Sequence, residues 1–435
     1  MAAGIIDLDV APPSAERPPL SLRRRLIPPR PALVVAIVLA ALVALGAAEP
    51  PGRSIRHLLS AGGQPAAAFE LSHDALFTAS FGNSPNSESG VRRFGLPDGK
   101  LRWAVALPQN VQNLVYDDAS HVLMGRSGAE PKVSFLDADT GEMLWHDESP
   151  NTIVVRLAGG EVLMQTDVSA DERALRLLDA RTGRQVWSRV VDSTAYLGPS
   201  DLWDRTPTRL IAVDTAGKVV VLNYADGTVL ARGDLHVTVP VQLDNSLGAD
   251  YVGVSTVADT LYVSRRERGV TTLAAWSIAS LTPVWRVTGG PAGFVDDCGP
   301  VLCVPDNGMV SALDPADGRL LWQRPGLGFA YRHDARSLLA FDLSETPEAA
   351  LLDPVTGAVM RRFGRVVDLH NVLLRSDRMR FGRTWVEVAG GDGALHVVGA
   401  LDTAAPYGCE LSGPYLACPT SAGPTQVWQI PLHLT

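Results

Sequence analysis

The sequence has little charge and no concentration of basic residues. Charged residues make up 20% of the 435 residues, and the 47 Asp and Glu outnumber the 38 Lys and Arg, which gives a formal net charge of −9. No stripe rich in Lys or Arg follows the first 30 residues. Nucleic-acid binding depends on clustered positive charge, so the composition argues against a nucleic-acid partner.

Motifs for catalysis and metal binding are also missing. The 4 cysteines include no adjacent pair and no Cys-x-x-Cys spacing, and the 9 histidines include no His-Glu-x-x-His motif. The sequence lacks a Gly-x-Ser-x-Gly nucleophile elbow and a phosphate-binding glycine loop. We therefore predict no catalytic, cofactor-binding or metal-binding residues.

Helical periodicity is absent after about residue 50. Hydrophobic residues make up 46% of the chain, which excludes a disordered protein. The 40 Gly and 31 Pro favour short strands joined by turns. A length that would otherwise suit two or three domains is therefore compatible with one large all-β domain.

One long apolar run, from Ala32 to Ala48, contains no charged residue and would span roughly 25 Å as a helix. Four arginines precede it (Arg23, Arg24, Arg25 and Arg30), so the positive-inside rule keeps the N-terminus in the cytoplasm. We predict a single-pass signal anchor in the cell membrane. Its parts are a flexible cytoplasmic tail over 1–30, a transmembrane helix over 31–48, a linker over 49–54 and an extracytoplasmic domain over 55–435.

Three other interpretations of this region stay open. Small residues at Gly46 and Ala48 permit cleavage after Ala48, although the leader before the apolar run is long for a secretory signal. The run from Arg23 to Ile27 has features of a twin-arginine export signal, and Pro28 and Pro29 weaken that match. A buried core helix is the third, but the run has no polar face.

A repeat with a period of about 40 residues organises the rest of the chain. Its marker is a turn glycine, and in four copies a tryptophan follows four positions later. The pairs are Gly99 with Trp103, Gly141 with Trp145, Gly183 with Trp187, and Gly318 with Trp322. Further copies contain Gly227, Gly357 and, more weakly, Gly393, and in one degraded copy Leu281 replaces the glycine while Trp285 keeps its place.

Each repeat predicts short strands around a tight hairpin. In Asp137-Ala-Asp-Thr-Gly141, the Asp and Thr side chains can hydrogen-bond to the turn, and glycine supplies a positive φ. About four strands in 40 residues correspond to one propeller blade. We predict an all-β propeller of about eight four-stranded blades, within a range of seven to nine, preceded by one transmembrane helix. Three C-terminal strands between Gly408 and Ile430 would be completed by an N-terminal strand around Ile55–Leu59.

The recurring Asp-x-x-Thr-Gly-x-x-x-Trp motif over residues 55–430 resembles the quinoprotein-dehydrogenase-like propellers, whose repeats carry the pyrroloquinoline quinone (PQQ) name. That superfamily includes PQQ-dependent alcohol dehydrogenases and noncatalytic propellers such as the outer-membrane assembly factor BamB. The dehydrogenases imply a longer chain, adjacent cysteines near the quinone and a calcium site. This chain lacks the cysteine pair, and no local motif marks a calcium ligand, so we expect no PQQ cofactor.

The repeat tryptophans and the cysteines are assigned structural roles. Because Trp103, Trp145, Trp187 and Trp322 keep one offset from the turn, we expect them to pack blade against blade rather than to stack on a cofactor. Each cysteine pair flanks a predicted hairpin turn in the exported part of the chain. We therefore predict the disulfides Cys298–Cys303 and Cys409–Cys418, with free buried thiols as the alternative.

The combined prediction is a membrane-anchored, extracytoplasmic propeller that serves as a noncatalytic binding or scaffolding platform. Its partner would be an envelope protein, a peptide or a glycan on a propeller face or in the channel. The loops over 82–90, 241–249 and 376–383 are the predicted contacts. The alternatives are a PQQ-dependent dehydrogenase facing the cell exterior, or a hydrolase or lyase built on the propeller.

Overall fold

The structure is a computed structural model, and contacts divide the chain into Met1–Pro51 and Gly52–Thr435. The described residues are 55–61, 68–80, 90–107, 110–128, 132–192, 194–199, 207–239, 251–291, 293–306, 308–343, 348–369, 372–376, 383–389, 395–402, 408–420 and 423–432. The predicted anchor lies outside these ranges, as do the predicted contact loops apart from their terminal residues Gly90, Ser376 and Arg383. Within the ranges, no helix has the length and apolar character needed to cross a membrane.

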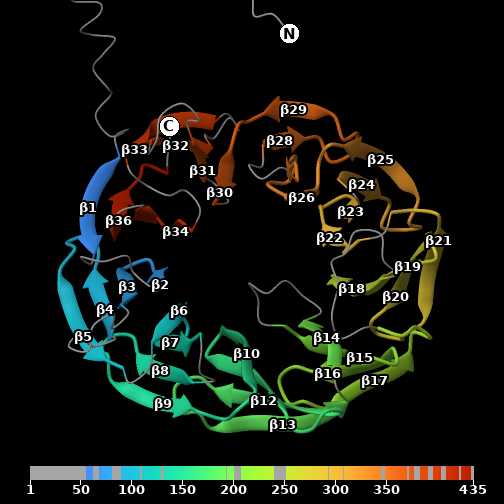
Figure 1. The fold of residues 1–435 in the computed structure, drawn as a ribbon, viewed down its shortest axis with the longest axis horizontal. Coiled ribbons are helices and arrows are strands. Elements are labelled where there is room, and N and C mark those ends of the chain that lie inside the picture. Colours follow the sequence, from blue (N-terminus) through green and yellow to red (C-terminus); the bar gives the residue numbers. More distant parts are fainter. Residues whose placement is uncertain are drawn as a thin grey trace, which may run out of the picture. The chain divides into compact units, whose positions relative to one another are not determined.

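The described residues of the second unit form nine four-stranded antiparallel sheets arranged as the blades of a ring (Figure 1). Blades 1 to 8 each consist of four consecutive strands. The strands of blades 1 to 4 are β2 (Ala68–Leu71), β3 (Ala75–Ser80), β4 (Gly90–Gly95), β5 (Leu101–Ala106); β6 (Val111–Asp117), β7 (Val122–Ser127), β8 (Val133–Asp137), β9 (Met143–Asp147); β10 (Thr152–Ala158), β11 (Glu161–Asp167), β12 (Glu172–Asp179), β13 (Gln185–Asp192); and β14 (Thr194–Pro199), β15 (Arg209–Asp214), β16 (Lys218–Asn223), β17 (Val229–Asp234).

Blades 5 to 8 repeat the same strand order in the second half of the ring. Their strands are β18 (Tyr251–Val257), β19 (Thr260–Glu267), β20 (Val270–Ser277), β21 (Pro283–Thr288); β22 (Asp296–Asp297), β23 (Leu302–Asp306), β24 (Met309–Leu313), β25 (Leu320–Pro325); β26 (Phe329–Arg332), β27 (Leu338–Phe341), β28 (Ala349–Leu352), β29 (Val359–Arg362); and β30 (Val366–Asp368), β31 (Val372–Ser376), β32 (Arg383–Ala389), β33 (Leu395–Asp402).

Blade 9 joins the two ends of the propeller. Its strands are β34 (Glu410–Ser412), β35 (Tyr415–Thr420), β36 (Gly423–Gln429) and, as the outermost strand, β1 (Arg56–Ala61). The antiparallel pairing of β1 with β36 confirms the predicted closure by an N-terminal strand. The structure has nine blades, one more than the predicted number of eight and inside the predicted range of seven to nine, because the C-terminal strands and β1 form a complete blade in addition to the eight blades of consecutive strands.

The apolar core lies between neighbouring blades. The second strand of a blade is the most buried, as in β3, where five of six residues are buried, whereas an outer strand such as β5 alternates exposed and half-buried residues. One cluster joins Phe77 of blade 1 to Leu123 and Leu136 of blade 2. Figure 1 shows the first strand of each blade nearest the centre of the ring, so side chains of these inner strands are the ones placed beside the central opening.

The repeat turns connect the third and outermost strands of a blade. In blade 2, the Asp137 carboxylate accepts hydrogen bonds from the backbone N–H groups of Asp139 and Thr140 and from the Thr140 hydroxyl. Gly141 follows with φ +77°, a conformation that side chains disfavour. The degraded copy keeps this geometry, with Leu281 at φ 52°. The blade period thus follows from turn chemistry that the sequence repeats.

Candidate functional site

Three carboxylates from different inner strands line one pocket of about 610 Å³. Glu70 comes from β2 of blade 1, Asp368 from β30 of blade 8 and Glu410 from β34 of blade 9. The remaining lining residues are Leu71, Leu369, Cys409, Leu411, Gly413 and Leu432. Ring closure therefore brings residues from opposite ends of the domain into one site, which we call the acidic pocket.

Glu70 and Glu410 form a coupled pair in this pocket. Burial, together with the nearby Glu410 charge, raises the pKa of Glu70 to about 8. Burial also raises the pKa of Glu410 to about 7, although its Oε2 atom accepts a hydrogen bond of 2.8 Å from the backbone N–H of Leu71. Since two largely buried carboxylates close to each other repel, the pair holds about one proton near neutral pH.

Asp368 is deeply buried, with its side chain 4% exposed. Its Oδ2 atom lies 3.2 Å from Nδ1 of His333, which is 9% exposed, and this hydrogen bond raises the pKa of His333. The Oδ1 atom has no hydrogen-bond partner among the residues that the structure describes. A buried carboxylate oxygen left in this state is costly unless a ligand supplies a donor.

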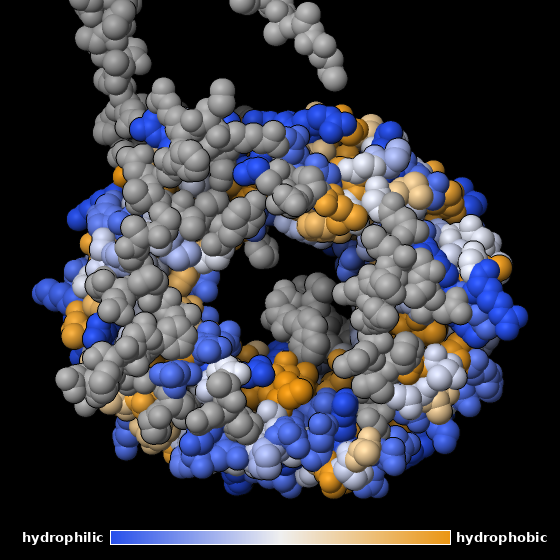
Figure 2. Space-filling model, in the orientation of Figure 1, coloured by the Kyte–Doolittle hydropathy of each residue, from blue (hydrophilic) through white to orange (hydrophobic). Residues whose placement is uncertain are grey.

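An aromatic surface adjoins the acidic pocket on β26 of blade 7. Burial of Tyr331, the nearby Asp368 charge and a side-chain hydrogen bond to Asp368 together raise the pKa of the phenol. Its ring stacks with Phe341 at 5.8 Å between centroids, and Phe341 stacks in turn with Phe329 at 4.9 Å. Phe329 is 39% exposed. Figure 2 shows hydrophobic side chains at the rim of the central opening over the position of β26.

The repeat tryptophans lie at the junctions between blades. Each indole packs over the turn of the next blade and donates its N–H to a backbone carbonyl there. The acceptors are Ala138 for Trp103, Ala180 for Trp145, Tyr224 for Trp187, Pro315 for Trp285 and Pro354 for Trp322, at 2.7–3.0 Å. A Cβ atom on Gly227 would lie 2.7 Å from the Trp187 ring, so the glycine is needed for this contact.

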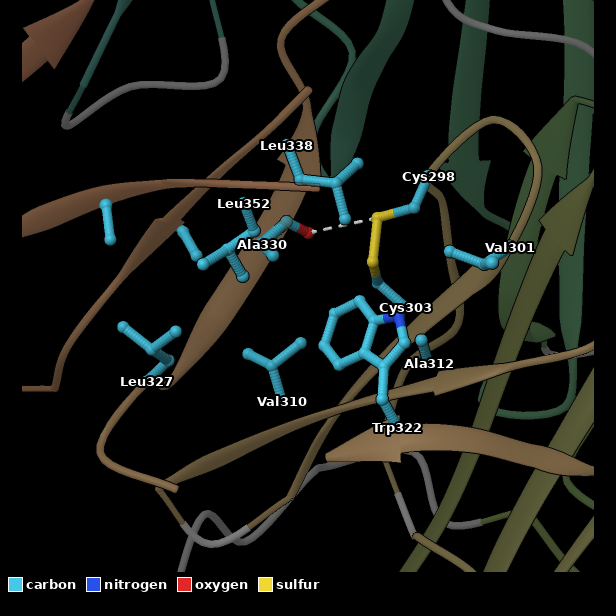
Figure 3. Close-up of a cluster of buried hydrophobic side chains, with 12 residues drawn as sticks. Cys298, Val301, Cys303, Val310, Ala312, Trp322, Leu327, Ala330, Leu338 and Leu352 are labelled. Atoms are coloured by element: carbon cyan, nitrogen blue, oxygen red, sulfur yellow. Dashed lines mark hydrogen bonds between the residues drawn. A yellow bond between two sulfur atoms is a disulfide. The ribbon is translucent and has the colours of Figure 1, made fainter. Parts of the chain in front are cut away.

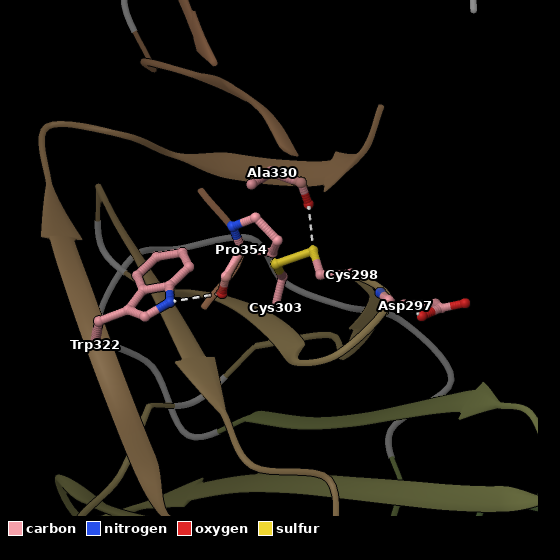
Figure 4. The surroundings of a disulfide bond; sticks show 7 residues. Asp297, Cys298, Cys303, Trp322, Ala330 and Pro354 are labelled. Carbon is pink, nitrogen blue, oxygen red and sulfur yellow. Dashed lines mark hydrogen bonds between the residues drawn. A yellow bond between two sulfur atoms is a disulfide. The ribbon is translucent and has the colours of Figure 1, made fainter. Parts of the chain in front are cut away.

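The structure contains both predicted disulfides, Cys298–Cys303 and Cys409–Cys418. Each links the first two strands of its blade. Cys298 directly follows β22 and Cys303 lies in β23 of blade 6, whereas Cys409 directly precedes β34 and Cys418 lies in β35 of blade 9. Figure 3 shows the first disulfide in an apolar cluster beside Trp322. In Figure 4 the indole of Trp322 donates to Pro354 next to the same disulfide, and Cys298 Sγ lies 3.7 Å from the Ala330 carbonyl.

The acidic pocket does not fit the quinone that the repeat name implies. PQQ is a tricarboxylate, and among the described lining residues none is Lys or Arg, whereas three are acidic. An anion placed there would be repelled by the carboxylates. Within the described ranges, no group of three or more His, Cys, Asp or Glu side chains has the arrangement of a metal site. The repeat tryptophans have their polar atoms committed to blade junctions.

The acidic pocket was not predicted from the sequence. Each carboxylate is the one acidic residue inside an otherwise apolar stretch, as in Phe69-Glu70-Leu71 and Cys409-Glu410-Leu411. Combined with the repeat register, which assigns these stretches to the inner strands, that pattern is a signal that could have identified the residues. The register alone, however, does not reveal that blades 8, 9 and 1 place them in one pocket.

Comparison with known proteins identifies a family. A family profile described as outer membrane protein assembly factor BamB matches residues 87–324, more than half of the chain. No curated protein sequence matches the chain significantly. Among solved structures, BamB from Moraxella catarrhalis aligns at 15% identity and a TM-score of 0.46, covering 88% of this chain and 99% of its own. The WD40 domain of Sif2 aligns at 12% identity and 0.45, covering 87% and 99%, and a europium-containing methanol dehydrogenase at 11% and 0.41, covering 85% of both chains.

Proposed function

The chain belongs to the PQQ-repeat propeller family described as outer membrane protein assembly factor BamB, and from this premise we propose that it is a noncatalytic binding or scaffolding platform. The family match over 87–324 carries the proposal, because that description is of a protein that acts in assembly. We propose an envelope protein as the partner. The alternatives are a peptide or a glycan bound on a propeller face or in the channel.

The inner strands supply chemistry that suits binding. The aromatic surface around Phe329 offers an exposed apolar contact, and the acidic pocket beside it offers charge. Rigid blades hold both features, so a partner would meet a preorganised surface and would lose little free energy to ordering it. Propeller loops and channels of this kind commonly serve as docking sites.

We place the propeller outside the cytoplasm. Two disulfides persist in oxidising compartments and are rare in the cytosol. The apolar run from Ala32 to Ala48, with arginines on its N-terminal side, would anchor the propeller to the outer face of the cell membrane, leaving residues 1–30 in the cytoplasm. The propeller would then act close to the membrane surface.

The experiment that tests the platform compares partner capture with quinone chemistry in the same preparation. The tagged full-length chain is crosslinked in intact membranes and captured, and the recovered protein is then tagged and captured in the reverse direction. We expect one envelope protein to be recovered in both directions at near-equal amounts. We also expect added PQQ and Ca²⁺ to leave the melting temperature unchanged and to produce no dye reduction with alcohols.

The opposite pattern would remove the proposal. A chain that captures no protein in either direction, but shows a quinone absorbance band and PQQ-dependent dye reduction, is a dehydrogenase facing the cell exterior. Both readouts come from one preparation, so one melting curve shows whether the protein used for both is folded.

A further inference from the structure

We propose that the acidic pocket receives the cationic side chain of an arginine or lysine from the bound partner, with the neighbouring aromatic surface contacting the same segment. This inference rests on the proposed platform function and names the chemistry of its partner. The pocket, its unpaired carboxylate oxygen and the exposed aromatic ring lie on consecutive blades from 7 through 9 to 1.

The unpaired Oδ1 atom of Asp368 points to a missing donor. The side chain is 96% buried and lines the pocket. Its Oδ2 atom contacts His333, Tyr331 hydrogen-bonds the carboxylate, and the Oδ1 atom has no partner among the described residues. Leaving the second oxygen desolvated and unpaired is unfavourable. A guanidinium or ammonium group carries several N–H donors and no acceptor, so it can satisfy this oxygen and a second carboxylate at once.

The charge of the pocket favours the same ligand. The charges of Glu70 and Glu410 repel each other, and the basic side chain paired with Asp368 is His333. A second positive charge would offset the repulsion between the two glutamates. Since the carboxylate side chains are largely buried, a cation paired with them would interact more strongly than on an exposed surface.

The aromatic surface favours a peptide segment over a free amine. Every second residue of β26 points to the same side of the strand. These residues are Phe329, Tyr331 and, directly after the strand, His333. Tyr331 and His333 both lie at Asp368, so Phe329 lies about 7 Å further along the strand. A side chain two or three positions from the cationic residue would reach the exposed ring of Phe329.

Filling the pocket should release a proton. Each carboxylate of the pocket has different neighbours. Glu70 lies near Glu410 and accepts a hydrogen bond from the backbone N–H of Tyr116, and Glu410 accepts one from the backbone N–H of Leu71. Asp368 contacts His333 and Tyr331. An entering cation favours the ionised form of both glutamates, so the proton that they share leaves on binding. Affinity should therefore increase as the pH rises from 6 to 8, and loss of a proton from His333, whose pKa Asp368 raises, would act in the same direction.

The test uses the full-length chain in detergent and three probes. The probes are a labelled Ac-Gly-Leu-Ala-Arg-Gly-amide peptide, the same peptide with citrulline in place of arginine, and spermidine. Citrulline keeps the shape of arginine and removes its charge. We expect the arginine peptide to bind at least tenfold more tightly than the citrulline peptide, with a calorimetric enthalpy that depends on the ionisation enthalpy of the buffer because a proton is released.

Variants then locate the binding. Glu410→Gln keeps an oxygen that can accept the Leu71 N–H, so this variant should fold. Glu410→Gln and Asp368→Asn, each as a single variant, should weaken binding of the arginine peptide at least tenfold. The matched control is Glu142→Gln, at an exposed turn of blade 2. Phe329→Ala should weaken the peptide at least threefold and leave spermidine binding unchanged, whereas Leu320→Ala on outer strand β25 should affect neither.

Three results would overturn the inference. Equal binding of the arginine and citrulline peptides would show that charge is not recognised, and unchanged binding by folded Glu410→Gln would place recognition elsewhere. Binding of spermidine without binding of the peptide would assign the pocket to a free polyamine. If partner capture from membranes succeeds while these tests fail, the platform function stands and only the pocket assignment is wrong.

Discussion

Replacing Trp187 with alanine is expected to lower the free energy of unfolding by about 3–5 kcal/mol. The side chain is 7% exposed and packs with Leu175, Leu177 and Tyr224 across the junction of blades 3 and 4. Its indole N–H donates to the Tyr224 carbonyl at 2.7 Å. Truncation would leave a cavity over Gly227 and a buried carbonyl without its donor, and both effects destabilise the folded state.

Urea denaturation followed by circular dichroism measures this effect. The matched control is Val186→Ala, at the neighbouring position of the same outer strand, where the side chain is 48% exposed. We expect the control to stay within about 0.5 kcal/mol of the wild type. Equal effects of the two substitutions would show that the repeat tryptophans do not hold the blades together.

Replacing Glu70 with glutamine is expected to remove much of the loss of stability that the wild type shows as the pH rises. In the folded protein the pKa of Glu70 is raised from 4.5 to about 8, so the folded state retains a proton that the unfolded chain releases. Stability therefore falls as the pH rises from about 4.5 towards 8 and levels off above it. With coupling to Glu410 taken into account, the fall due to Glu70 is on the order of 3 kcal/mol.

Unfolding free energies at pH 5, 6, 7 and 8 provide the measurement. Glu70→Gln should be more stable than the wild type at pH 8 and close to it at pH 5. Glu142→Gln, at an exposed turn, should follow the wild type at every pH. His333 also contributes a fall over this range, and the difference between the wild type and Glu70→Gln isolates the carboxyl. Parallel pH profiles for these two proteins would mean that Glu70 is not held protonated by the fold.

The blades could be predicted because their determinants are local. Most turns carry a glycine, and in four repeats a tryptophan follows it at the same offset of four positions. One repeat therefore predicts the hairpin of its blade without reference to the rest of the chain. Closure by residues near Ile55 was also predictable, since three C-terminal strands lacked a fourth. The blade number was missed by one, because blade 9 has no repeat turn: its outermost strand arrives from the N-terminal end.

The acidic pocket could not be predicted in the same way. Glu410 lies 339 positions beyond Leu71, to whose backbone N–H it is hydrogen-bonded, and Glu70 directly precedes Leu71 in the chain. Their encounter depends on how many blades complete the ring and on which strand is innermost. The raised pKa values likewise arise from burial by neighbouring blades. Local sequence encodes the repeat, whereas the site is a product of ring closure.

Photo-crosslinking from the channel rim tests the account most directly. Benzoylphenylalanine is placed at position 329 in the full-length chain in living cells, with a matched substitution at Val284, which is 56% exposed on outer strand β21. We expect one protein adduct of defined mass from position 329 and none from position 284. The absence of any adduct from position 329, or the same adducts from both positions, would contradict a docking site on the inner strands.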